Sequence, residues 1–234
     1  MASLYLFPVP MGDAAPADVL PEPNLKLIRE IKYFVVENLR SARRFLKSVD
    51  RTINIDELHF EELSEHTRRE DVEGMLAPMA EGHSMGVISE AGCPAVADPG
   101  ADLVAAAQRR GYKVVPMVGP SSILLSLMAS GFNGQSFTFL GYLPVEGRSR
   151  TAMFREMERE IRAKRRTQIF IETPYRNNRL IDDLCKSVPP DMLLCVASDI
   201  TGPKESIVTL PIAEWRVRKY DYSKIPTIFL LFYR

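Results

Sequence analysis

The sequence predicts an α/β protein built of two α/β domains, the first with a mostly parallel sheet and the second with a mixed sheet. Short apolar runs alternate with amphipathic helical segments along the first half, a pattern typical of parallel strands joined by crossover helices. In the second half, only residues 211–225 separate the last two predicted strands. This length has room for a short helix at most and favours an antiparallel pairing. The turn-rich segment 118–122 predicts domains 1–118 and 119–234.

Each predicted element follows from its own pattern of apolar and turn residues. In the first domain the strands are Leu4–Val9, Tyr33–Val36, Met85–Ser89 and Lys113–Met117, and the helices are 40–49, 71–80 and Ala101–Gln108. In the second, the strands are Phe137–Leu140, Gln168–Glu172, Leu193–Ser198, Glu205–Leu210 and Pro226–Tyr233, and the helices are Ser122–Ser130, Arg150–Arg162 and Asn177–Ser187.

Composition narrows the class of protein. The 234 residues are 46% hydrophobic and 26% charged, as in ordinary globular proteins. Three scattered cysteines do not make a disulfide framework. The longest apolar runs are far shorter than the ~20 residues of a membrane span, and no secretory pattern opens the chain. We therefore expect a cytoplasmic protein without a membrane segment.

The net charge of zero conceals an asymmetry between the two halves. Residues 1–117 carry 13 basic and 18 acidic side chains, a balance of −5, whereas residues 118–234 carry 17 and 12, a balance of +5. Ten of the basic residues, against four acidic ones, lie between Arg148 and Arg179. This excess suits a polyanion such as RNA, although a solvated helix end explains it equally well. The candidate phosphate contacts are Arg162, Lys164, Arg165 and Arg166, and the candidate stacking aromatics, which core packing also explains, are Tyr142, Phe154 and Tyr175.

The usual nucleotide-site motifs are missing from the sequence. It contains no GxGxxG, P-loop or GxSxG pattern, and its three histidines form no HExxH motif. We therefore expect no metal site. Glycine- and proline-rich loops instead follow the predicted strands, at residues 8–13, 89–100 and 119–122. Because ligands of open α/β sheets bind at the carboxyl ends of the strands, these loops predict a binding crevice.

The same loops resemble a known family. The sequence contains, in this order, a strand followed by Pro-x-Gly near the N-terminus and then the motifs SEAGCPAVADPG, VGPSS, FLGYLP and FIETPYR. This series of motifs is similar to that of the tetrapyrrole-methylase superfamily of S-adenosylmethionine-dependent methyltransferases. Within it they are most similar to the ribosomal RNA small subunit methyltransferase I branch. The resemblance spans essentially the whole chain.

The resemblance implies a homodimeric enzyme that holds S-adenosylmethionine in a cleft between its two domains. It implies activity on the ribose 2′-hydroxyl of small-subunit (16S-type) ribosomal RNA, and hence a role in rRNA processing. Carried over residue by residue, the cofactor site consists of Pro10, Glu90, Ala91, Gly92, Cys93, Val96, Ser121, Ser122, Ile171, Glu172, Thr173, Pro226 and Thr227.

A ribose hydroxyl loses its proton during methyl transfer, so a base or a polarising cation assists the reaction. Glu172, Arg40 and Lys204 are the catalytic candidates, with Glu37 and Glu205 as neighbouring carboxylates. For each carboxylate, an ion-pair or helix-cap role is the competing explanation.

Two segments depart from the family pattern. The family's EDTR appears as Glu37-Asn38-Leu39-Arg40, and its HEHNE as Ser64-Glu65-His66-Thr67-Arg68. The chain also lacks the small C-terminal extension that ribosomal members commonly carry. Two other functions therefore stay open: methylation of a tetrapyrrole-like or other small molecule, and a non-catalytic module that binds S-adenosylmethionine or RNA.

Overall fold

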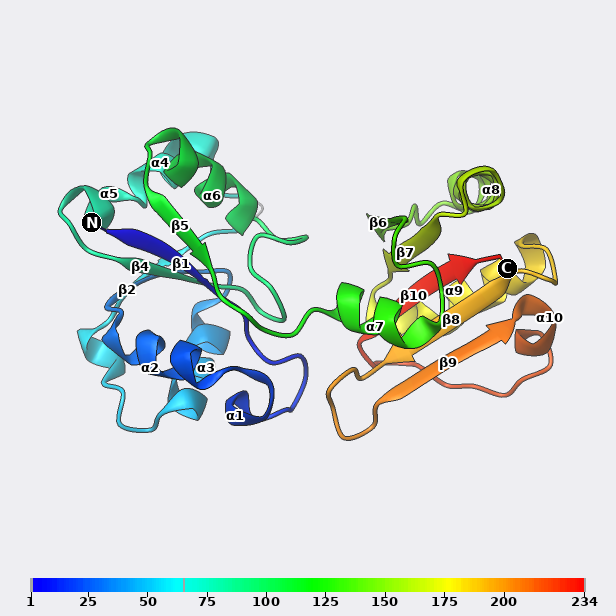
Figure 1. Ribbon diagram of the computed structural model, residues 1–234, viewed down its shortest axis with the longest axis horizontal. Coiled ribbons are helices and arrows are strands. Elements are labelled where there is room, and N and C mark those ends of the chain that lie inside the picture. The colour runs from blue at the N-terminus through cyan, green and yellow to red at the C-terminus, as the bar shows by residue number, and fades with distance from the viewer. Residues whose placement is uncertain (1, 65, 234) are drawn as a thin grey trace. The chain divides into compact units, whose positions relative to one another are not determined.

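The computed structural model describes residues 2–64 and 66–233. They form two compact units, Met1–Ser121 and Ser122–Arg234, each built around its own five-stranded sheet (Figure 1). The division falls three residues beyond the sequence-predicted boundary after residue 118.

The sheet of the first unit is parallel throughout, in the order β3-β2-β4-β1-β5. All its strands therefore end at one edge. The strands are β1 (Ser3–Phe7), β2 (Tyr33–Val36), β3 (His59–Glu62), β4 (Met85–Ile88) and β5 (Lys113–Pro116).

Helices cover both faces of this sheet because its central strands are apolar on both sides. Leu4, Val35 and Val87 contribute to the core on one face, with residues of α4 and α6, while Phe7 and Phe34 contribute to the core on the other, with α2 and α3. The helices are α1 (Pro16–Val19), α2 (Glu22–Glu30), α3 (Leu39–Val49), the 3₁₀ helix η1 (Ile55–Glu57), α4 (Arg69–Gly74), α5 (Ala77–Ala80) and α6 (Gly100–Arg109).

The sheet of the second unit is mixed, in the order β6-β7-β10-β8-β9. Only β6 and β7 pair in parallel, and β10 is antiparallel to both of its neighbours. The elements are α7 (Ser122–Ser130), β6 (Phe137–Tyr142), α8 (Gly147–Lys164), β7 (Thr167–Ile171), η2 (Pro174–Arg176), α9 (Asn177–Ser187), β8 (Leu193–Ser198), β9 (Ser206–Pro211), α10 (Ile212–Trp215) and β10 (Thr227–Phe232). None of the described helices is both long and apolar enough to cross a bilayer.

The fold class predicted from the sequence is confirmed, but the predicted pairing of the last two strands is wrong. β9 pairs with β8 in a hairpin, and β10 lies between β7 and β8. All six residues of β10 are buried, so this strand suits a central position and not an edge.

Three other details differ from the prediction. Strand β3 was not predicted because its HFEE sequence has mostly exposed side chains and no apolar alternation. Helices α1 and α2 were not predicted either. The single helix expected over residues 71–80 is two helices, since Pro78 lacks the N–H that a continuous helix would donate to Gly74.

Gly86 on the central strand β4 gives a test of this packing. A Cβ at this position would lie 2.7 Å from Phe34 Cε1 and 3.0 Å from Phe7 Cε2. We expect Gly86→Ala to lower the free energy of unfolding by about 1–3 kcal/mol in chemical denaturation, because the rings have to shift. Gly74→Ala is the control, since nothing lies within 4 Å of its Cβ. Equal stability of the two variants would contradict the packing.

Candidate functional site

The loops after β1 and β4 are joined to each other at the carboxyl edge of the parallel sheet. Val9 and Gly92 form an isolated antiparallel bridge: the Val9 N–H donates to the Gly92 carbonyl at 2.9 Å, and the Gly92 N–H donates to the Val9 carbonyl at 3.2 Å. Gly92 has a φ of +69°, in the left-handed region that favours glycine. The bridge places Pro10 and Met11 directly beside the 89–100 loop.

The third loop, after β5, packs against the first two. The Cys93 thiol donates to the Pro120 carbonyl at 3.4 Å, and burial raises the pKa of this thiol, which keeps its proton in place. The buried Asn24 side chain donates to the Val118 carbonyl at 2.7 Å. A Cβ on Gly119 would clash with the ring of Pro8, so glycine permits the close approach here. The structure therefore gathers all three sequence-predicted loops of this unit.

Asp98 holds the 89–100 loop in its shape. Its carboxylate accepts the Ala95 N–H, 2.9 Å from each oxygen, and the Gly100 N–H at 2.7 Å. Ala95 and Ala97 have φ values of 64° and 60°, which costs roughly 1–2 kcal/mol for each such residue. Burial raises the pKa of Asp98, and the two backbone donors oppose that rise. The strained backbone is thus stabilised by one partly buried carboxylate, a residue that the sequence analysis did not single out.

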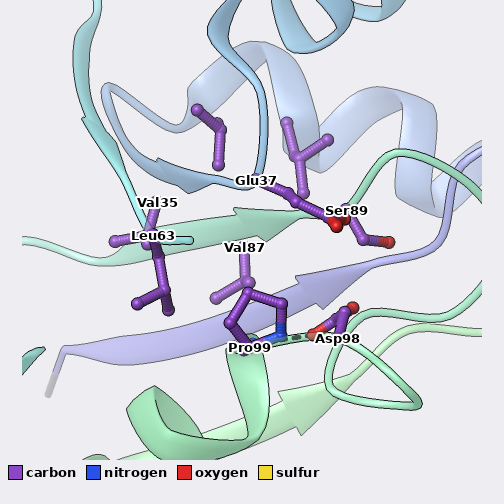
Figure 2. A pocket seen from close by; sticks show the side chains of 10 residues that line it. Val35, Glu37, Leu63, Val87, Ser89, Asp98 and Pro99 are labelled. Atoms are coloured by element: carbon purple, nitrogen blue, oxygen red, sulfur yellow. Dashed lines mark hydrogen bonds between the residues drawn. The ribbon is translucent and has the colours of Figure 1, made fainter. Parts of the chain in front are cut away.

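A small cavity lies beneath this loop, between the ends of β2 and β4 (Figure 2). Its volume is about 10 Å³, room for roughly one water molecule. Val35, Leu63 and Val87 line its apolar side, and the buried Ser89 hydroxyl has no hydrogen-bond partner among residues 2–64 and 66–233. The cavity is too small for a nucleotide-sized ligand. The part of the loop available to a ligand is its exposed side, which carries Glu90, Ala91 and Val96.

The side chain of Glu37 is hydrogen-bonded to the backbone of Glu90 at the start of the 89–100 loop. Glu37 accepts the Glu90 N–H at 3.0 Å, and the Ser41 hydroxyl donates to the Glu90 carboxylate at 3.3 Å. Arg40 lies in the same first turn of α3, is exposed, and has no ion-pair partner among residues 2–64 and 66–233. The structure thus places the Glu37–Arg40 segment at the edge that carries the loops. Glu65, in the second departing segment, lies outside the described residues.

Ser121 and Ser122 are half-buried at the division between the units. Within the described part of the chain, neither hydroxyl has a hydrogen-bond partner. Both therefore remain available as donors to a ligand carboxylate or hydroxyl.

In the second unit, Glu172 lies at the centre of a buried ion-pair network. Arg150 donates to one of its oxygens at 3.1 Å, while Arg176 at 2.7 Å and the Thr173 N–H at 2.7 Å donate to the other. Arg150 also pairs with Asp183 at 3.0 Å. The side chains of Arg150 and Glu172 are 3% and 1% exposed. Since both Glu172 oxygens already accept hydrogen bonds, this geometry suits a positioning carboxylate better than a base.

The other predicted site residues of this unit gather at one edge of its sheet. Antiparallel register places Ile171 opposite Ile228, next to Thr227. The Pro226 carbonyl accepts the Asp199 N–H at 2.9 Å, and the Asp199 carboxylate accepts the Lys204 N–H at 2.7 Å. Asp199, which the sequence analysis also missed, therefore links Lys204 to the start of β10.

The residues predicted to contact RNA differ in their ion pairing and in their exposure. In helix α8 and just beyond it, Arg162 pairs with Glu158 at 2.8 Å, and Lys164 and Arg166 both pair with Glu160, at 2.9 and 3.4 Å. Phe154 is 2% exposed and belongs to the core, so it is not available for stacking. Tyr142 and Tyr175, in contrast, are 62% and 77% exposed.

The chain is similar to known proteins over most of its length. The Tetrapyrrole (Corrin/Porphyrin) Methylases family matches residues 14–215. The Ribosomal RNA small subunit methyltransferase I of Vibrio cholerae is 28% identical over 211 residues, which are 90% of this chain and 69% of that protein. The protein of the same name from Escherichia coli O157:H7 is 27% identical over 211 residues, 90% of this chain and 70% of that protein.

Solved structures share the fold. The methyltransferase CobJ superposes with a TM-score of 0.64 at 16% identity, covering 99% of this chain and 93% of that one. The uroporphyrin III C-methyltransferase of Thermus thermophilus gives 0.57 at 18% identity, covering 99% and 97%. From the family match and the shared two-sheet architecture, the chain belongs to the tetrapyrrole (corrin/porphyrin) methylases, and it is an S-adenosylmethionine-dependent methyltransferase.

Proposed function

We propose that this enzyme transfers a methyl group from S-adenosylmethionine to the 2′-hydroxyl of a ribose in small-subunit ribosomal RNA. The observation that carries the proposal is the similarity, over 90% of the chain, to relatives named ribosomal RNA small subunit methyltransferase I. A cytoplasmic location follows from this substrate, and the resemblance to the family supports a homodimer.

For the cofactor site, we propose the residues carried over from the family in both units. The chemistry of the donors fits S-adenosylmethionine, which presents a cationic sulfonium, an amino acid group and an adenine. In the first unit Glu90 offers an exposed carboxylate, and Ala91 and Val96 offer apolar surface. Ser121, at the end of the first unit, and Ser122, at the start of the second, offer hydroxyls without partners among the described residues. Gly92 and Cys93 join neighbouring loops through Val9 and Pro120, and Pro10 follows directly after this bridge. The other candidates carried over in the second unit are Ile171, Glu172, Thr173, Pro226 and Thr227.

When bound, the cofactor supplies an electrophilic methyl group attached to sulfur. The task of the protein is then to hold the acceptor oxygen in line with that group, about 3 Å away, and to assist the loss of its proton. Arg40 and Lys204 have exposed side chains without ion-pair partners in the described ranges, so each is available to polarise the acceptor hydroxyl. We assign Glu172 a positioning role, through Arg176 and the Thr173 backbone.

The acceptor is tested by mapping ribose 2′-O-methylation in ribosomal RNA from a strain that lacks the gene. We expect one methylated ribose of the small-subunit RNA to be lost and then restored by the wild-type gene. An unchanged map, combined with transfer to a tetrapyrrole-like molecule in vitro, would favour the small-molecule alternative. Binding of S-adenosylmethionine without transfer to any acceptor would favour the non-catalytic one.

The cofactor loops are tested through Asp98. Asp98→Ala leaves the Ala95 and Gly100 N–H groups without their acceptor, so we expect the 89–100 loop to lose its shape. Because unpaired donors cost about 1–3 kcal/mol, calorimetry should show an S-adenosylmethionine affinity at least ~5-fold weaker. Asp102→Ala is the control, since Asp102 is exposed on α6. Wild-type affinity of the Asp98 variant would show that the loop does not bind the cofactor.

The role of Glu172 is tested by separating stability from turnover. Removing one partner of a buried ion pair costs about 3–5 kcal/mol, so we expect both Arg150→Met and Glu172→Gln to lower the free energy of unfolding by this amount. Arg162→Ala, which breaks an exposed pair, should cost about 1 kcal/mol or less.

At a temperature where Glu172→Gln is folded, we expect the transfer rate to stay within ~5-fold of wild type. A general base contributes roughly 10²- to 10⁴-fold. A decrease of that size in the transfer rate, with unchanged stability, would show that Glu172 is a catalytic residue.

A further inference from the structure

An open groove of about 870 Å³ lies in the second unit, and none of the residues assigned to the cofactor lines it. Helix α9 forms one side, and the chain from the end of α10 to Tyr220 forms the other. Four basic residues line it, Lys186, Arg216, Arg218 and Lys219, with Asp182 as the single acidic one. Only one of the four, Lys186, belongs to a helix predicted from the sequence.

The 215–220 segment is fixed at its start by two side chains. The fully buried Trp215 donates from its indole N–H to the Leu194 carbonyl at 3.0 Å. Arg216 donates to the Cys185 carbonyl at 2.8 Å and to the Val188 carbonyl at 3.3 Å, which satisfies free carbonyls at the end of α9. The Arg216 guanidinium therefore stabilises the wall of the groove through hydrogen bonds to backbone carbonyls.

The end of the segment is fixed by Tyr220, whose hydroxyl donates to the Asp182 carboxylate at 2.6 Å. Burial and the adjacent carboxylate raise the pKa of Tyr220, so the hydroxyl remains a donor. This bond engages one oxygen of Asp182, the single carboxylate among the residues that line the groove. The backbone that carries Arg218 and Lys219 is thus held at both ends against α9.

The remaining three cations have no acidic partner among the described residues. Lys186, Arg218 and Lys219 are exposed, and none forms an ion pair there. The Arg218 guanidinium lies over the Trp215 ring at 5.6 Å, which orients it without neutralising its charge. In helix α8, in contrast, Arg162 is paired with Glu158 and Lys164 with Glu160. The available positive charge of this unit therefore includes the groove, outside the Arg148–Arg179 stretch.

We propose that the groove formed by Lys186, Arg218 and Lys219 binds the phosphate backbone of the RNA substrate. This inference rests on the proposed function and extends it, because it assigns RNA a contact surface made of residues other than those proposed for methyl transfer. Three exposed cations without acidic partners among the described residues, all lining one groove, suit contacts with phosphate groups. Such contacts contribute affinity without reading sequence.

The test compares two triple variants with equal loss of charge. The groove variant is Lys186→Ala, Arg218→Ala and Lys219→Ala, and the control is Arg162→Ala, Lys164→Ala and Arg166→Ala in the ion-paired region. Binding of a small-subunit ribosomal RNA fragment is measured by fluorescence anisotropy over a series of KCl concentrations.

The logarithm of the RNA association constant falls linearly with the logarithm of the KCl concentration, and each lost phosphate contact reduces the magnitude of this slope by about 1. We expect the magnitude of the slope to decrease by about 2–3 for the groove variant and to change little for the control. Both variants should keep wild-type affinity for S-adenosylmethionine, because no substituted residue belongs to the proposed cofactor site.

The outcomes separate the two proposals. If the wild-type enzyme does not bind the RNA, the proposed function fails. If the wild type binds and the groove variant keeps its slope, the groove inference alone fails. Binding of the wild type and of both variants to vesicles containing phosphatidylserine is measured as well. Binding to them that depends on the three cations, with an unchanged RNA slope, would assign the groove to a membrane surface and overturn the inference.

Discussion

The parallel hydrogen bonding of the first sheet is the constraint on which the candidate site depends. Because β1, β4 and β5 all run in the same direction, the loops that follow them leave from one edge, although these strands end at Phe7, Ile88 and Pro116. The Val9–Gly92 bridge and the Cys93–Pro120 contact then join neighbouring loops. A reversal of any one strand would move its loop to the opposite edge.

The two units hold their proposed site residues by different physical means. In the first, a partly buried carboxylate accepts backbone donors, so Asp98 stabilises a strained loop without any cation. In the second, Arg150 connects α8, the end of β7 and α9 through Glu172 and Asp183. The first arrangement fixes the shape of a backbone, while the second fixes three elements relative to one another.

The sequence was most informative where local chemistry decides the structure. Ser122–Ser130 and Asn177–Ser187 are found at the predicted bounds because helix periodicity and flanking residues define both. Strand β3 has no apolar alternation and is held by its pairing with β2, which no local pattern reveals. The contact of Ile171 with the start of β10 depends on strand order, and the strand order was predicted wrongly. The pairing of Glu158 with Arg162 was available from their spacing of four residues.

The central position of β10 has a consequence for synthesis on the ribosome. The first unit has β4 and β1 near its centre and receives β5 at an edge, so its sheet is nearly complete before residue 113 emerges. The second unit receives its middle strand last, at residues 227–232. Until then, the edges of β7 and β8 that will pair with β10 remain open, and such edges are prone to aggregation. During this interval the second unit therefore presents two unpaired strand edges at the centre of its future sheet.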